Sequence, residues 1–141
     1  MNSNPTPASA LSEAHRALLD DMLRLGHLIQ TSGNVGELHE RLSSTYTHLC
    51  HHLRLEEQGG YFDNVQEREP RLQRAVSDLA AEHRELRQSL DALRAEAGVA
   101  NAVDDAMRAK VRAWIDRYLA HETHENDVAQ DEVDLDVGTV D

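Results

Sequence analysis

The chain has 141 residues, which is close to the usual size of one domain and long enough to bury a hydrophobic core. Hydrophobic residues make up 40% of it but aromatic residues only 4%, and the Val/Ile/Thr-rich alternation typical of strands is scarce, so an all-α protein is predicted. The net charge of −12 argues against nucleic acid and anionic membrane surfaces as partners, because both bind basic surfaces.

The sequence also gives no reason to expect a membrane protein or an oxidising compartment. Cys50 is the only cysteine, so no internal disulfide can form. No run approaches the roughly 20 apolar residues of a membrane span. The first residues lack the basic and apolar regions of a signal peptide. We therefore expect a soluble, cytoplasmic protein.

Two amphipathic helices are predicted in the first half of the chain. Residues 1–8 are polar and contain proline, and we expect a disordered lead-in. The first helix should run over about 9–30, where apolar residues recur at alternating steps of four and three. Gly33 or Asn34 would suit a left-handed C-cap there. The second helix should run over about 35–64.

The second half of the chain has the same pattern. A third helix is predicted over about 70–96, with Pro70 in its first turn. Residues 98–101 end it, and a fourth helix follows over about 103–129. Residues 131–141 are acidic and lack helical periodicity, so we expect a mobile acidic tail.

Short connections and narrow apolar stripes together predict an up-down-up-down four-helix bundle over residues 9–130. The stripe residues of the four helices are, in chain order, Leu11, His15, Leu18, Met22, Leu25, Ile29; Leu38, Leu42, Thr45, Leu49, His52, Glu56; Leu72, Val76, Leu79, His83, Leu86, Leu90, Leu93; and Met107, Val111, Trp114, Tyr118, His121, Glu125, Val128. These side chains should face the bundle core.

Ionisable side chains interrupt every one of these stripes. They are His15, His52, Glu56, His83, His121 and Glu125. Four imidazoles and two carboxylates in a bundle core would cost several kcal/mol if nothing compensated them. The stripe histidines of the first and third helices lie 68 residues apart, and the His-x-x-x-Glu pairs of the second and fourth lie 69 apart. This repeat predicts a pseudo-two-fold axis and a pair of metal ions with these six ligands.

The ordered set, from His15 to Glu125, resembles the hemerythrin-like family, also described as HHE cation-binding domains. Residues 52–57, followed by residues 60–62, are similar to that family's second helix. The resemblance implies two non-haem iron ions, oxo- or hydroxo-bridged, with Glu56 and Glu125 also bridging them and the four histidines as terminal ligands. Manganese or zinc could substitute for iron in such a ligand set.

The sequence departs from the oxygen-carrying hemerythrins at two places. Those proteins have a second histidine on the third helix at His-x-x-x-His spacing, whereas Leu79 and Arg87 stand four residues on either side of His83. They have His-x-x-x-x-Asp on the fourth helix, where this chain has Asn126 and the candidate carboxylate is Glu125. About five ligands per iron would leave about one open position, which favours binding or reducing O₂, nitric oxide or peroxide over simple oxygen carriage.

Three functions remain open at this point. The first is a di-iron protein that binds a small diatomic molecule or a peroxide as a sensor, scavenger or modest redox enzyme. The second is an iron- or redox-responsive regulatory module that acts through an unknown partner protein. Ferritin-like iron storage ranks last, because that family uses Glu-x-x-His pairs and this chain has His-x-x-x-Glu.

The remaining polar residues near the pattern are predicted not to be ligands. The off-stripe histidines are His27, His39, His48, His51 and His124. Among them, His48 lies one turn before His52 and could line an access path or supply an extra ligand. Glu57 and Glu122 should lie beside the ligands or on the surface. The dry layer around the metals should consist of Leu18, Leu49, Leu86 and Tyr118, and the Tyr118 hydroxyl could hydrogen-bond near the site.

Overall fold

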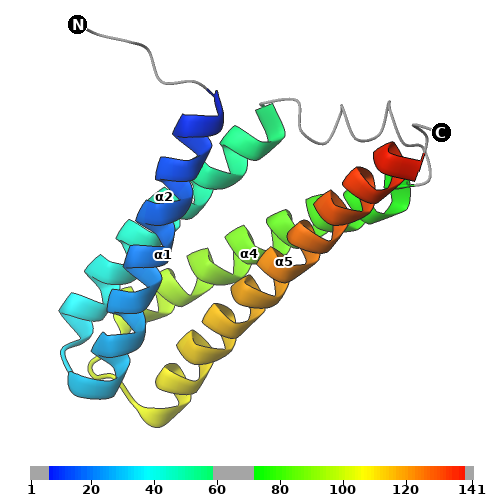
Figure 1. Cartoon of the computed structure of the whole chain (residues 1–141). Helices are drawn as coiled ribbons and strands as arrows, with labels where there is room; N and C mark the ends of the chain where they lie inside the picture. The colour runs from blue at the N-terminus through cyan, green and yellow to red at the C-terminus, as the bar shows by residue number, and fades with distance from the viewer. Residues whose placement is uncertain (1–6, 59–71, 139–141) are drawn as a thin grey trace, which may run out of the picture.

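The computed structural model describes residues 7–58 and 72–138, with side chains over residues 9–58 and 72–128. The described chain forms four α-helices, which are α1 (Pro7–Thr31), α2 (Val35–Gln58), α4 (Gln73–Val99) and α5 (Asp105–Gly138). Each helix packs against the next in the chain (Figure 1). The predicted all-α, up-down four-helix bundle is confirmed.

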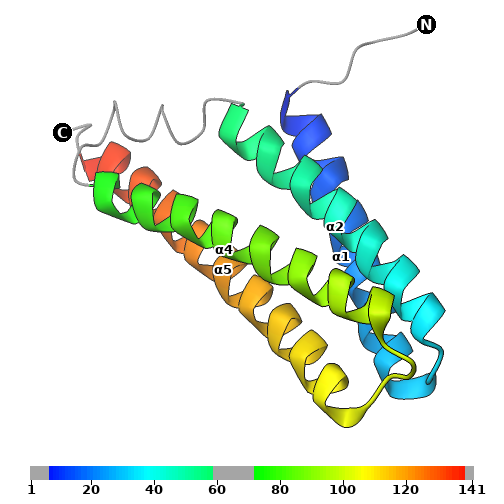
Figure 2. The same cartoon turned by 180° about the vertical axis from the view of Figure 1, so that it is seen from behind.

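The bundle consists of two helical hairpins, α1 with α2 and α4 with α5. The hairpins lie close together at the end where residues 32–34 and 100–104 connect their helices, and they diverge toward the opposite end (Figures 1 and 2). Helix α2 is the main contact between them, since it packs on α4 as well as on α1.

The connection between α1 and α2 differs from the prediction. Gly33 does not adopt a left-handed backbone conformation. Asn34 acts at the start of α2 instead of the end of α1, because its Oδ1 accepts a hydrogen bond from the Glu37 amide at 3.1 Å. An amide hydrogen of a first helical turn has no partner within the helix, and an asparagine side chain satisfies it well.

Two helix boundaries also lie beyond the predicted ones. Helix α1 begins at Pro7, inside the expected lead-in, because the fixed φ of proline suits a first helical turn. Helix α5 continues to Gly138, so the expected non-helical tail is helical over most of its length. No proline interrupts residues 130–138, and each further residue adds a backbone hydrogen bond to an existing helix.

The predicted boundaries around the second connection cannot be compared with the structure. The end of the second helix near residue 64, and Pro70 in the first turn of the third, lie outside the described residues. Within the described residues, α2 reaches Gln58 and α4 is preceded by Leu72.

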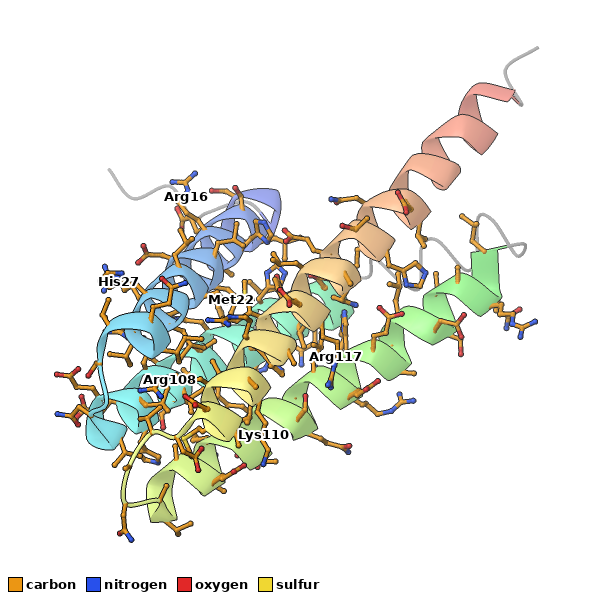
Figure 3. All side chains as sticks on the ribbon, turned by 90° about the horizontal axis from the view of Figure 1, so that it is seen from below. Arg16, Met22, His27, Arg108, Lys110 and Arg117 are labelled. Carbon is orange, nitrogen blue, oxygen red and sulfur yellow. The ribbon has the colours of Figure 1, made fainter. Side chains whose placement is uncertain are left out.

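The predicted stripes form the core. All of their members are buried except Leu11, His15 and Glu125, which are partly exposed. Figure 3 shows Met22 directed into the bundle, whereas Arg16 and His27 of the same helix point away from it. No described helix is long and apolar enough to cross a membrane.

Candidate metal centre

The two His-x-x-x-Glu pairs meet in the bundle core. His52 Nε2 lies 2.6 Å from Glu56 Oε1 on α2, and His121 Nε2 lies 2.7 Å from Glu125 Oε1 on α5. His52, Glu56 and His121 are buried, and only 14% of the Glu125 side chain is exposed. A spacing of four residues places both members of each pair on one helical face, as the sequence predicts.

Contacts between helices join the two pairs into one cluster. The imidazole of His83, on α4, brings Nε2 to 3.6 Å from Glu56 Oε2, and its ring centroid lies 4.8 Å from that of His121. The carboxyl groups of Glu56 and Glu125 lie close enough to shift each other's pKa. Among the described residues, the ligand atoms of His83, His121 and Glu125 lie within 4.8 Å of one another, close enough to hold a metal ion.

His15 lies at the edge of this cluster. Its ring centroid is 5.3 Å from that of His52, and 34% of its side chain is exposed. Its Nε2 lies 2.6 Å from Glu122 Oε1, on the turn of α5 before Glu125. The structure therefore brings all six predicted residues into one region, but it pairs His15 with Glu122 and not with either of the predicted bridging glutamates.

Glu57 orients the ring of His83. Its Oε1 lies 3.2 Å from His83 Nδ1, and Arg87 holds the same carboxylate with Nη2 at 2.9 Å from Oε2. A carboxylate that accepts the Nδ1 hydrogen of a histidine leaves Nε2 with a lone pair directed at the centre. Glu57 thus has the supporting position that the sequence predicts.

Glu82 holds the ring of His121 in the same way, and this contact was not predicted from the sequence. Its Oε1 lies 2.7 Å from His121 Nδ1, and its Oε2 lies 2.8 Å from His124 Nδ1. Glu82 is on α4 and both histidines are on α5, so the contact depends on how the two helices are rotated against each other. In the sequence, only the position of Glu82 next to His83 could have indicated this role.

Burial and mutual proximity perturb the carboxyl groups. Burial raises the pKa of Glu125, and the neighbouring Glu56 raises it further. For Glu56, burial alone would also raise the pKa, but hydrogen bonds from His52 and Glu125 lower it overall. The raised pKa favours the protonated form of Glu125 in the metal-free protein. A bound cation would replace this proton and favour both carboxylates in their ionised form.

The four residues predicted to form a dry layer around the metals lie in the core. Leu18, Leu49, Leu86 and Tyr118 are all buried. A small cavity of about 210 Å³ lies beside the cluster between α4 and α5, and Glu82, Arg117, His121 and His124 are among its lining residues. His121 is therefore the cluster residue that this cavity reaches.

The off-stripe His48 contacts a carboxylate of α1. Its Nδ1 is hydrogen-bonded to Asp21, a buried carboxylate on α1 that also accepts a hydrogen bond from Ser44 Oγ at 3.2 Å and pairs with Arg41 at 3.4 Å. This contact joins α1 to α2 outside the cluster. The sequence analysis did not predict a buried residue at Asp21, because it does not fall on the apolar stripe of α1.

A comparison with protein families matches most of the chain to a cation-binding domain. The model of the hemerythrin HHE cation-binding domain matches residues 6–132, which include every residue of the cluster. Neither a curated protein nor a solved structure gives a significant match.

Proposed function

Because the chain belongs to the hemerythrin HHE cation-binding domain family, we propose that its cation site is a non-haem di-iron centre that binds O₂, nitric oxide or a peroxide. His83 and His121 would hold one ion, and His15 and His52 the second. Glu56, which is close to both His52 and His83, and Glu125 would be shared by both ions. The two close ring contacts, 4.8 Å within the first pair and 5.3 Å within the second, support this division.

The observation that carries the proposal is the convergence of His83, His121 and Glu125, whose ligand atoms lie within 4.8 Å of one another in the core. Imidazole and carboxylate donors together suit iron, and zinc and manganese can also bind to them. When bound, a pair of iron ions supplies electrons and open coordination positions for a small ligand.

The protein's own side chains would prepare the site for this chemistry. Glu57 and Glu82 hold the rings of His83 and His121 by their Nδ1 atoms, which fixes the direction of Nε2. Glu125, whose pKa burial and Glu56 raise, would release its proton when a cation binds. The leucines around the cluster exclude bulk water and strengthen electrostatic interactions within it.

Elemental analysis of protein purified after growth in iron-rich medium tests the proposal, together with absorption spectra of the oxidised and reduced forms. We expect about two iron ions per chain and near-ultraviolet bands that change on addition of nitric oxide or peroxide. One metal ion per chain, or none, would refute the di-iron centre. A spectrum that neither ligand changes would favour the alternative, a regulatory module that acts through a partner protein.

A further inference from the structure

We propose that the hydroxyl group of Tyr118 donates a hydrogen bond to the small ligand that binds at the metal centre. This inference rests on the proposed di-iron function, and it assigns to one side chain the recognition of the bound ligand.

The first observation is a buried polar group without a partner. Only 1% of Tyr118 is exposed, and its hydroxyl oxygen has no hydrogen-bond partner among the described residues. Buried hydroxyl groups in folded proteins nearly always have a partner, because an unsatisfied one costs stability. The unpaired hydroxyl group of Tyr118 is therefore available to bind a ligand.

The second observation is where this hydroxyl lies. Tyr118 precedes His121 by nearly one turn of α5, and their ring centroids are 6.3 Å apart. Burial raises the pKa of Tyr118, and the carboxylates of Glu122, Glu125 and Glu56 raise it further, which places the hydroxyl near carboxylates contributed by both α2 and α5. The side chain of Tyr118 thus lies beside His121 and within electrostatic range of Glu56 and Glu125.

The third observation is that the ring is held in place. Trp114 stacks on Tyr118 with an interplanar angle of 20° and a centroid distance of 6.0 Å. Trp114 is itself anchored, since its Nε1 donates a hydrogen bond to the Leu86 carbonyl oxygen at 3.1 Å. A fixed donor beside the centre is suited to an anionic or polarised ligand, because little conformational freedom is lost when the bond forms.

Azide, a small anion that binds open positions on ferric iron, can probe this contact. We compare iron-loaded wild type with Tyr118→Phe by titrating azide and following the charge-transfer absorption. Loss of the donor should raise the azide Kd by about tenfold, the usual effect of one hydrogen bond to a charged group. The iron content and helical content should not change, since the phenyl ring keeps the stacking on Trp114.

Tyr46→Phe is the matched control. Tyr46 lies on α2, is partly exposed, and has Arg94 over its ring at 4.4 Å, so it carries the same hydroxyl group away from the metal cluster. We expect its azide Kd to equal that of wild type.

The vibrational spectrum of bound azide tests for the hydrogen bond directly in the wild-type protein. In wild type, exchange into D₂O should shift the antisymmetric azide stretch, because the ligand accepts a hydrogen bond from an exchangeable proton. The shift should disappear in Tyr118→Phe.

An unchanged azide Kd in Tyr118→Phe would overturn the inference and leave the di-iron proposal intact. Absence of a deuterium shift in wild type would do the same. Loss of iron from Tyr118→Phe would assign the residue to metal retention and would also overturn it. Wild-type protein without iron would instead refute the proposed function, and this inference with it.

Discussion

At the scale of single residues, His83 is the most informative histidine. It is fully buried in the position where the stripe of α4 would otherwise have an apolar side chain, and it contacts Glu56 and Glu57 at once. An imidazole in that position contributes less to packing than leucine would. Ligation of a cation would explain its placement, since metal binding would offset the cost of burying it.

The variant His83→Leu separates the contribution of this position to packing from its proposed role in metal binding. We expect unchanged helix content by circular dichroism, because leucine continues the stripe and Glu57 keeps its ion pair with Arg87. Iron content should fall to half of the wild-type value or less, since one proposed iron loses a ligand. His27→Leu, on the exposed side of α1, is the matched control and should retain full iron. Unchanged iron in His83→Leu would exclude His83 as a ligand.

The sequence predicts residues that follow a helical period and misses residues that depend on helix rotation. His52 and Glu56 are four residues apart on one helix, so their contact is determined locally. Glu82 reaches His121 and His124 across 39 and 42 residues of chain, and no spacing rule predicts that contact. Asp21 is similar, because its burial depends on Ser44 and Arg41 of the neighbouring helix.

At the scale of helices, the apolar stripes are predicted almost completely, but the ends are not. An apolar stripe indicates the buried face along the whole length of a helix. An end depends on a few local hydrogen bonds, such as the one that moves Asn34 from a predicted C-cap to the N-cap of α2. No apolar stripe in the sequence predicts that α5 continues to Gly138.

The N-cap of α5 gives a test at this scale. Asp104 Oδ1 accepts a hydrogen bond from the Met107 amide at 2.8 Å, so Asp104→Ala should lower the free energy of unfolding by about 1 kcal/mol. Asp105→Ala removes a fully exposed partner of Arg108 and should leave the free energy of unfolding nearly unchanged, because an exposed ion pair contributes little. Thermal unfolding measures both.

Iron content should stay at the wild-type value in both variants, because residue 104 lies roughly 25 Å along the helix from His121. A large loss of iron in Asp104→Ala would contradict this separation between the capped end and the metal centre.

At the scale of the whole molecule, the candidate metal centre contains residues of both hairpins. Glu56 and His52 belong to the first hairpin, and Glu125 and His121 to the second. The hairpins diverge at the end where α1 begins and α2 ends (Figure 1). Among the described residues, the apolar cluster of Leu72, Val76, Leu79 and Val128 comes from α4 and α5 alone. Cations shared by Glu56 and Glu125 would therefore stabilise the association of the hairpins, and removing the metal should destabilise the bundle as a unit.

The carboxyl pair makes this stabilisation depend on pH. Burial, assisted by Glu56, raises the pKa of Glu125 from 4.5 to about 8. Between these values the folded, metal-free protein keeps a proton that the unfolded chain has released. The free energy of unfolding should therefore fall as pH rises from about 5 to 8, and Glu125 contributes at most about 1.4 kcal/mol per pH unit.

Bound metal displaces this proton, so metal should stabilise the protein more at pH 8 than at pH 6. Urea unfolding of chelator-treated and iron-loaded protein at both pH values measures the difference. Glu125→Gln carries no ionisable group at this position, so its metal-free form should lack this part of the pH dependence. The histidines titrate in both proteins, and comparing the two largely cancels their contribution. An equal pH dependence in wild type and Glu125→Gln would show that Glu125 is already ionised at neutral pH in the metal-free bundle, and that cations enter without displacing its proton.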